Sequence, residues 1–290
     1  MVQPPMVPSL QISQGFRRAM GIRDWINGLR QRQVPSQGTA TGTATDQQVA
    51  RWQKALSDFG YPYDLVSGST VDEAFALSRS AGDRGGFVPV VLVPGHWNSD
   101  KRTPDARCRR ARKLLRAVGD GQRFLADGLL AMYDDLRFDP ENPDPDLFDK
   151  LEPKESEVVS TGISIAKRYV AEQAAERPWD QVAIVRVPAA SSDELPAYFE
   201  WGGWNAVPST EMIVAVARHW KQTYGSELVA IGPDLLEFHA SRKPPDHAAV
   251  VSLLKEHYVF APEGFEFDRE FLEQAAAHLR ASTSWVFWWD

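Results

Sequence analysis

The chain has 290 residues, of which 43% are hydrophobic and 24% charged, and these proportions suit a folded protein and exclude a disordered or fibrous one. Its formal net charge of -7 argues against general attraction to nucleic acids or anionic membranes, because both attract positive charge. A single cysteine, Cys108, excludes an intramolecular disulfide and a cysteine-cluster zinc site. Because we find neither a signal peptide nor a long apolar run, we expect a soluble cytoplasmic protein without a membrane span.

The first 100 residues divide into two predicted parts. Residues 1–46 carry a weak amphipathic pattern followed by small polar residues, which predicts an N-terminal extension and a flexible linker. The extension either docks on the folded body or forms a partner-binding helix. Residues 47–100 are expected to form the first portion of the body. Its predicted elements are a helix after Asp46, a strand at 63–66, a helix from Val71 to Ala81 and a strand at 87–93. This order predicts a βαβ unit with a parallel strand pair and a right-handed crossover.

Residues 101–157 carry opposite charges in two blocks. Residues 101–123 hold nine Lys or Arg against two acidic residues, and 133–157 hold ten acidic residues against three basic ones. Thr103 followed by a proline is a typical helix start. We interpret the segment as a basic helix and an acidic, proline-rich insertion that neutralise each other. A nucleic-acid site is the alternative, but aromatic side chains on which bases could stack are almost absent.

Residues 158–290 are expected to form the C-terminal α/β portion. The predicted helices run from Ile163 to Glu176, from Ser209 to Tyr224, and onward from Asp246 and from Asp268. The predicted strands are 182–187, 197–201, 227–231, 235–240 and 285–289. The last strand, WVFWW, alternates large side chains to both faces, which predicts a strand covered on both sides. The expected fold class is therefore α/β, with a mixed β-sheet, helices on both faces and the C-terminal tryptophan-rich strand buried in the sheet.

Four motifs of this C-terminal part occur in a set order. They are WGGWN at 201–205, YGSE at 224–227, DLLE at 234–237 and WWD at 288–290. In this order they resemble the bacterial domain of unknown function 4253 (DUF4253), and the similarity spans about residues 181–290. The resemblance implies a fold family and a bacterial setting, and it implies no activity.

The WGGWN motif is the first candidate ligand site. Gly202 and Gly203 allow a positive φ angle or a close approach of another group to the main chain. Trp201 and Trp204 offer apolar faces to a ligand, and Asn205 offers both a donor and an acceptor. The same pattern also fits a structural turn whose indole rings fill the core.

Further candidate site residues lie on or after the predicted strands. Glu237 and His239 alternate along one strand and so share a face, where a carboxylate beside an imidazole suits a general base; a solvated strand face has the same pattern. His96 follows an apolar strand, at the end where parallel sheets bind ligands. Trp288 and Asp290, at the C-terminus, complete the set of ligand-binding candidates.

Known catalytic signatures are absent from the sequence, including GxSxG, GxxxxGK[ST], HExxH and GxGxxG. Together with the acidic charge, this favours a non-catalytic interaction module, such as an immunity or inhibitor protein that binds another bacterial protein. We expect no nucleic acid, no cofactor and no metal. Two alternatives stay open: a hydrolase or other enzyme with a His/Glu/Asp site near the WGGWN loop, and a module that binds a sugar or nucleobase on a tryptophan-lined cleft.

Overall fold

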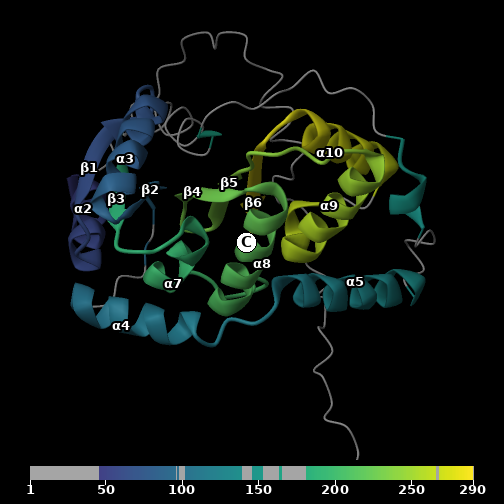
Figure 1. The fold of residues 1–290 in the computed structure, drawn as a ribbon, viewed down its shortest axis with the longest axis horizontal. Coiled ribbons are helices and arrows are strands. Elements are labelled where there is room, and N and C mark those ends of the chain that lie inside the picture. The colour runs from purple at the N-terminus through teal and green to yellow at the C-terminus, as the bar shows by residue number, and fades with distance from the viewer. Residues whose placement is uncertain are drawn as a thin grey trace, which may run out of the picture.

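The computed structural model describes residues 46–95, 97, 102–138, 146–152, 163–164, 181–265 and 268–289 (Figure 1). The α-helices are α2 (Asp46–Phe59), α3 (Val71–Gly85), α4 (Pro104–Leu115), α5 (Gly121–Phe138), α7 (Leu195–Phe199), α8 (Thr210–Tyr224), α9 (His247–Phe260) and α10 (Arg269–Ala281). The strands are β1 (Tyr63–Ser67), β2 (Val88–Leu92), β3 (Gln181–Val187), β4 (Glu227–Ile231), β5 (Leu235–His239) and β6 (Ser284–Trp288). Short 3-10 helices are η1 (Leu147–Lys150), η2 (Ser192–Glu194) and η3 (Pro262–Gly264).

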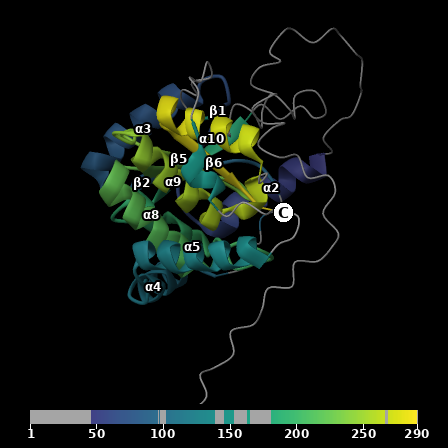
Figure 2. The ribbon, with the colours of Figure 1, turned by 90° about the vertical axis from the view of Figure 1, so that its right-hand side faces the viewer.

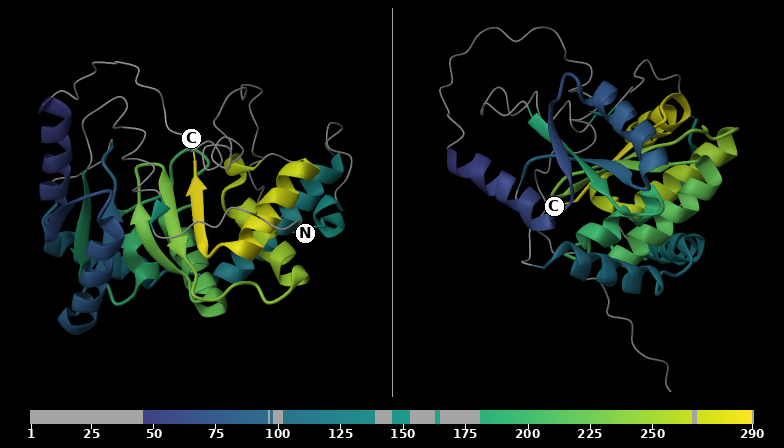
Figure 3. Two further views of the ribbon diagram at one scale, coloured as in Figure 1. Left: turned by 90° about the horizontal axis from the view of Figure 1, so that it is seen from above. Right: turned by 60° about the vertical axis from the view of Figure 1, so that its left-hand side comes forward.

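One mixed sheet organises these elements, with the strand order β1-β3-β2-β4-β5-β6. Neighbouring strands are antiparallel except for β2 and β4, which are parallel. Viewed from above, the strands follow one another from the blue N-terminal part of the structure to the yellow strand β6 (Figure 3). The predicted mixed sheet is therefore confirmed.

The predicted βαβ unit is wrong in its pairing. Strand β3 lies between β1 and β2 and is antiparallel to both, so Val185 has Tyr63 on one side and Val90 on the other. Strands β1 and β2 therefore point the same way without being neighbours. The ladder between β2 and β4 pairs Val91 with Ala230 and Leu92 with Ile231. It begins after Pro89, because proline has no N–H to donate to a neighbouring strand.

The predicted strand at 197–201 is also wrong, because residues 195–199 form the short helix α7. Pro196 lies in its first turn, where a missing N–H is tolerated. Glu200 ends the helix with a φ angle of 49°. All five helical residues are buried, so the apolar run had no exposed positions from which a period of 2 or 3.6 could be distinguished.

Helices cover both faces of the sheet, in unequal number. Helix α3 packs on one face, where its Val71 and Phe75 join Val91, Val182 and Ile184 in a small buried cluster. Helices α2, α7, α8, α9 and α10 contribute to the large core on the opposite face. Helices α4 and α5 form a further layer outside α7, α8 and α9, seen at the bottom of Figures 1 and 2.

The C-terminal strand is buried, as its alternating pattern of large apolar side chains predicts. Trp285, Phe287 and Trp289 are at most 3% exposed and face the large core, while Val286 and Trp288 are half-buried on the other face. Although β6 ends the strand order, its solvent-side edge is contacted by α10. The Nε2 atom of His278 lies 3.2 Å from the main-chain oxygen of Ser284. The aromatic terminus is thus part of the sheet.

Local helix signals are confirmed at several boundaries. The side chains of Ser209, Asp246 and Asp268 each accept a main-chain N–H in the first turn of the helix that follows. Thr103 does the same for α4. Gly225 ends α8 with a φ angle of 62°.

Some predictions lie outside the described residues. They include almost all of the extension at 1–46, residues 139–145 and 153–157 of the acidic block, and the helix from Ile163 to Glu176 beyond its first two residues. Among the described helices, none combines the length and the apolar character needed to cross a membrane.

Candidate functional site

The WGGWN motif forms a tight turn after α7. Trp201 is 3% exposed, and its indole Nε1 donates a hydrogen bond of 2.8 Å to the main-chain oxygen of Gly232. Gly202 and Gly203 have φ angles of 117° and 83°, as the sequence led us to expect. The group that approaches this turn closely is Pro208, whose main-chain oxygen accepts from the N–H of Gly203 at 2.9 Å.

The other two residues of the motif lie nearer the surface. Trp204 is half-buried, and its ring centroid lies 4.8 Å from that of Trp201 in an edge-to-face contact. Asn205 is exposed and has a φ angle of 46°. Of the WGGWN candidates, Gly203, Trp204 and Asn205 are therefore the ones that a ligand could most easily reach.

Replacing Gly202 by alanine is expected to destabilise the protein by about 1–3 kcal/mol, because its φ angle is nearly restricted to glycine. An added Cβ would also lie 2.6 Å from the Pro208 oxygen. Urea denaturation followed by tryptophan fluorescence measures this loss. Gly119→Ala is the matched control, since an added Cβ there meets nothing within 4 Å. Equal stability of the two variants would show that the turn relaxes without cost.

Three of the family motifs meet at this end of the sheet. The main-chain oxygen of Asp234 accepts from the N–H of Trp289 at 3.1 Å, and its carboxylate accepts from Trp288 Nε1 at 3.3 Å. The rings of Trp289 and Trp201 lie 5.4 Å apart. Asp234 was not among the predicted site residues, although its place at the start of DLLE, after a Gly-Pro turn, marks it as a turn residue. The WGGWN, DLLE and WWD motifs are therefore in direct contact with one another.

The end of β2 lies against the same turn. An added Cβ on Gly95 would come within 2.2 Å of the Pro233 ring, so the chain after β2 and the chain after β4 are in close contact. Trp97 bonds the main-chain oxygen of Val93 through its Nε1 at 3.0 Å. The candidates His96 and Asp290 lie outside the described residues.

Glu237 lies on the other face of the sheet and is completely buried. Its Oε1 atom accepts from the N–H and hydroxyl of Ser164 at 2.8 and 3.0 Å, and from the hydroxyl of Ser284 at 2.8 Å. The Nε2 atom of His239 lies 3.0 Å from the same oxygen, and the His239 side chain is 28% exposed. The predicted shared face of Glu237 and His239 is confirmed.

The structure does not combine these two groups into one site. Trp201 packs in the large core with Leu236 and Phe238, whose side chains point away from the face that carries Glu237 and His239. The sheet itself therefore separates the WGGWN turn from the glutamate. Within the described residues, no group of three metal-ligating side chains comes together.

The serine partners of Glu237 were missed from the sequence. Ser164 is 73 positions away along the chain, so only the tertiary structure brings it to the carboxylate. Ser284 lies directly opposite His239 in the β5–β6 pairing. Ser284 could in principle have been found from the sequence, because pairing of the two predicted strands in this register places it on the sheet face that carries Glu237 and His239.

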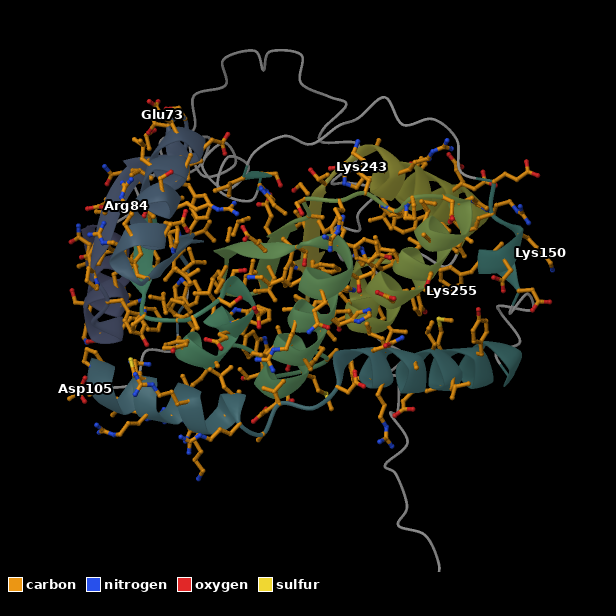
Figure 4. The ribbon with its side chains drawn as sticks, viewed as in Figure 1. Glu73, Arg84, Asp105, Lys150, Lys243 and Lys255 are labelled. Carbon is orange, nitrogen blue, oxygen red and sulfur yellow. The ribbon has the colours of Figure 1, made fainter. Side chains whose placement is uncertain are left out.

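Helix α4 presents a separate feature, a concentration of basic side chains. Arg107 is 3% exposed, and its guanidinium lies 5.3 Å from the centre of the Phe59 ring. Arg102 and Arg110 both pair with Glu200. Figure 4 shows Asp105 at the outer end of α4 and stick side chains that extend from this helix away from the body.

The comparisons with known proteins concern the C-terminal part. Residues 183–290 match the family model of the domain of unknown function DUF4253. No curated protein and no solved structure matches the chain. The resemblance carried by the four motifs is therefore confirmed, and the C-terminal part of this chain has both the motifs and the family match of DUF4253.

Proposed function

We propose that this protein is a non-catalytic interaction module that binds another protein in the bacterial cytoplasm. The observation that carries the proposal is the state of Glu237, the acid best suited to chemistry by its position beside a histidine. It has no exposed surface, and its Oε1 atom already accepts hydrogen bonds from Ser164 and Ser284. Such a carboxylate supports the fold, because its donors offset the cost of burying the charge.

The other motif residues support the same proposal. The indole of Trp201 is bonded to main chain, and Asp234 bonds both tryptophans of the WWD motif. A general base must lie within hydrogen-bond reach of the proton that it removes, and buried, bonded groups are poorly placed for this. The side chains that define the family motif therefore form a scaffold, which leaves the surface for recognition.

A cytoplasmic setting is part of the proposal. The only cysteine of the chain, Cys108, is a free and half-buried thiol, which suits a reducing compartment. The net charge of -7 keeps the module from binding polyanions through its overall field.

A second candidate function rests on the Glu237–His239 pair. The 3.0 Å contact orients an imidazole that keeps 28% of its surface exposed, as a general base on the surface would require. This candidate predicts that His239 is essential for a turnover that the native protein performs.

The substitution Glu237→Gln distinguishes the two functions. If Glu237 is structural, the variant loses about 1–3 kcal/mol of unfolding free energy, because buried donors lose a charged acceptor. The exposed Glu73→Gln is the matched control and is expected to keep native stability. Thermal melting of both variants measures the difference, alongside assays of ester, phosphoester and glycoside hydrolysis. Turnover by the native protein that disappears in folded Glu237→Gln and His239→Gln would establish the enzyme and refute the interaction module.

A further inference from the structure

We infer that the outward face of α4, formed by Arg109, Lys113 and Arg116 and called here the α4 cationic face, is the surface that binds the partner. The partner is a protein that presents a row of acidic side chains. This inference rests on the proposed interaction function and names the surface and the chemistry of the partner.

Helix α4 is a fixed platform. Its inward side includes Ala111, which has no exposed surface, and Arg107, whose guanidinium lies over the Phe59 ring. Cys108 and Leu114 pack partly buried against the same core. A helix held in this way presents its opposite side in a defined geometry, which lowers the ordering cost of binding.

The basic residues of the α4 region fall into two groups by their partners. Arg102 and Arg110 are neutralised by Glu200, and the Arg112 side chain bonds Tyr198. By contrast, the side chains of Arg109, Lys113 and Arg116 are exposed and make neither an ion pair nor a hydrogen bond to the described residues. Among the acidic-block residues whose side chains the structure describes, none pairs with these three.

Unpartnered cations are concentrated here. In the part of the chain whose side chains are described, the Lys and Arg residues without a partner are Arg51, Arg84, Arg109, Lys113, Arg116 and Arg280. Half of them lie on one face of α4, counting Arg116, which follows the helix directly and keeps a helical conformation. The others are single residues on α2, α3 and α10.

The spacing of the three cations makes them a linear array. Positions i, i+4 and i+7 lie on one side of a helix and here span about 10 Å along its axis. Like charges at this spacing repel each other by a few tenths of a kcal/mol. Carboxylates of a partner placed along the array would replace this repulsion with attraction. Figures 1 and 2 show no described element beyond α4 on this side.

An acidic protein fits this face better than a nucleic acid does. The α4 sequence PDARCRRARKLL contains no aromatic residue on which a base could stack. The net charge of -7 also opposes approach of a long polyanion, whereas a local acidic patch meets only the cationic face.

The test compares two triple variants with the same change of charge. One is Arg109→Glu, Lys113→Glu and Arg116→Glu, which reverses the cationic face. The matched control is Arg51→Glu, Arg84→Glu and Arg280→Glu, at exposed and equally unpartnered positions. The probes are a short fluorescein-labelled oligoglutamate peptide, which stands for a local acidic patch, and a labelled DNA duplex, measured by fluorescence anisotropy at low salt. Circular dichroism checks that both variants fold.

We expect the native protein to bind the oligoglutamate peptide, and the face reversal to weaken binding at least ~10-fold while the control changes it by less than ~3-fold. Three results would overturn the inference: no binding by the native protein, equal losses in the two variants, or tighter binding of the DNA duplex. After any of these results the proposed function as an interaction module would still stand if cross-linking finds a protein partner. Substrate turnover, in contrast, would refute the module whatever the probes show.

Discussion

Replacing Trp220 by alanine is expected to lower the free energy of unfolding by about 3–5 kcal/mol, the range for large aromatic truncations in a core. Trp220, on α8, has no exposed surface. Its ring stacks on Phe287 with a centroid separation of 5.2 Å and meets the rings of Trp285 and Phe260 edge-on. Alanine would leave a cavity between α8 and the sheet that the surrounding rings cannot all fill.

Urea denaturation, followed by near-ultraviolet circular dichroism, measures this loss. Trp288→Ala is the matched control, because it removes the same side chain from a half-buried position on the other face of β6. We expect the control to lose clearly less stability. Equal losses of unfolding free energy in the two variants would mean that the aromatic cluster around Trp220 stabilises the protein no more than a half-buried tryptophan does.

Acidification is expected to destabilise the protein through His257. This imidazole is 5% exposed, and its ring centroid lies within 5.0 Å of those of Trp220, Trp285 and Phe287. Burial, and to a smaller degree the charge of His278, lowers the pKa of His257 to about 3. The folded state therefore holds the neutral form.

The direction of the pH effect follows from the two states of the chain. Below an unfolded pKa of about 6.5 the unfolded chain binds a proton that the folded chain does not, so stability falls as the pH is lowered toward 3. The expected contribution is a loss of about 2 kcal/mol between about pH 7.5 and pH 5.

The measurement is the difference in unfolding free energy between these two pH values, for the native protein and for His257→Gln. The variant is expected to show a smaller pH dependence even if its stability is lower at both values. His247→Gln, at the exposed start of α9, is the control and should keep the native dependence. If His257→Gln keeps it as well, the acid sensitivity comes from other groups.

The two candidate regions can be tested independently. Glu237 lies on the sheet face covered in part by α3, and α4 lies outside the helices of the opposite face. The substitutions proposed for them share no contact, so their effects on stability should add.

The features that depend on neighbouring residues could be predicted from the amino-acid sequence. The side chains of Ser209, Asp246 and Asp268 cap helices, and in each case the N–H group from which they accept lies only three positions ahead. The turn Gly232-Pro233-Asp234 joins β4 and β5, because glycine and proline are typical turn residues whose φ and ψ angles are set locally. Alternation in WVFWW identified a buried strand, because three large side chains on one face require a core.

Which elements become neighbours in the sheet could not be predicted from local patterns. The insertion of β3 between β1 and β2 depends on pairing between residues 91 to 122 positions apart, and residues 195–199 form the helix α7 in an apolar run whose pattern does not distinguish a helix from a strand. The same applies to the candidate sites. Glu237 was visible in the sequence, but its serine partners, its complete burial and its separation from WGGWN by the sheet depend on the packing of distant segments, which no local pattern encodes.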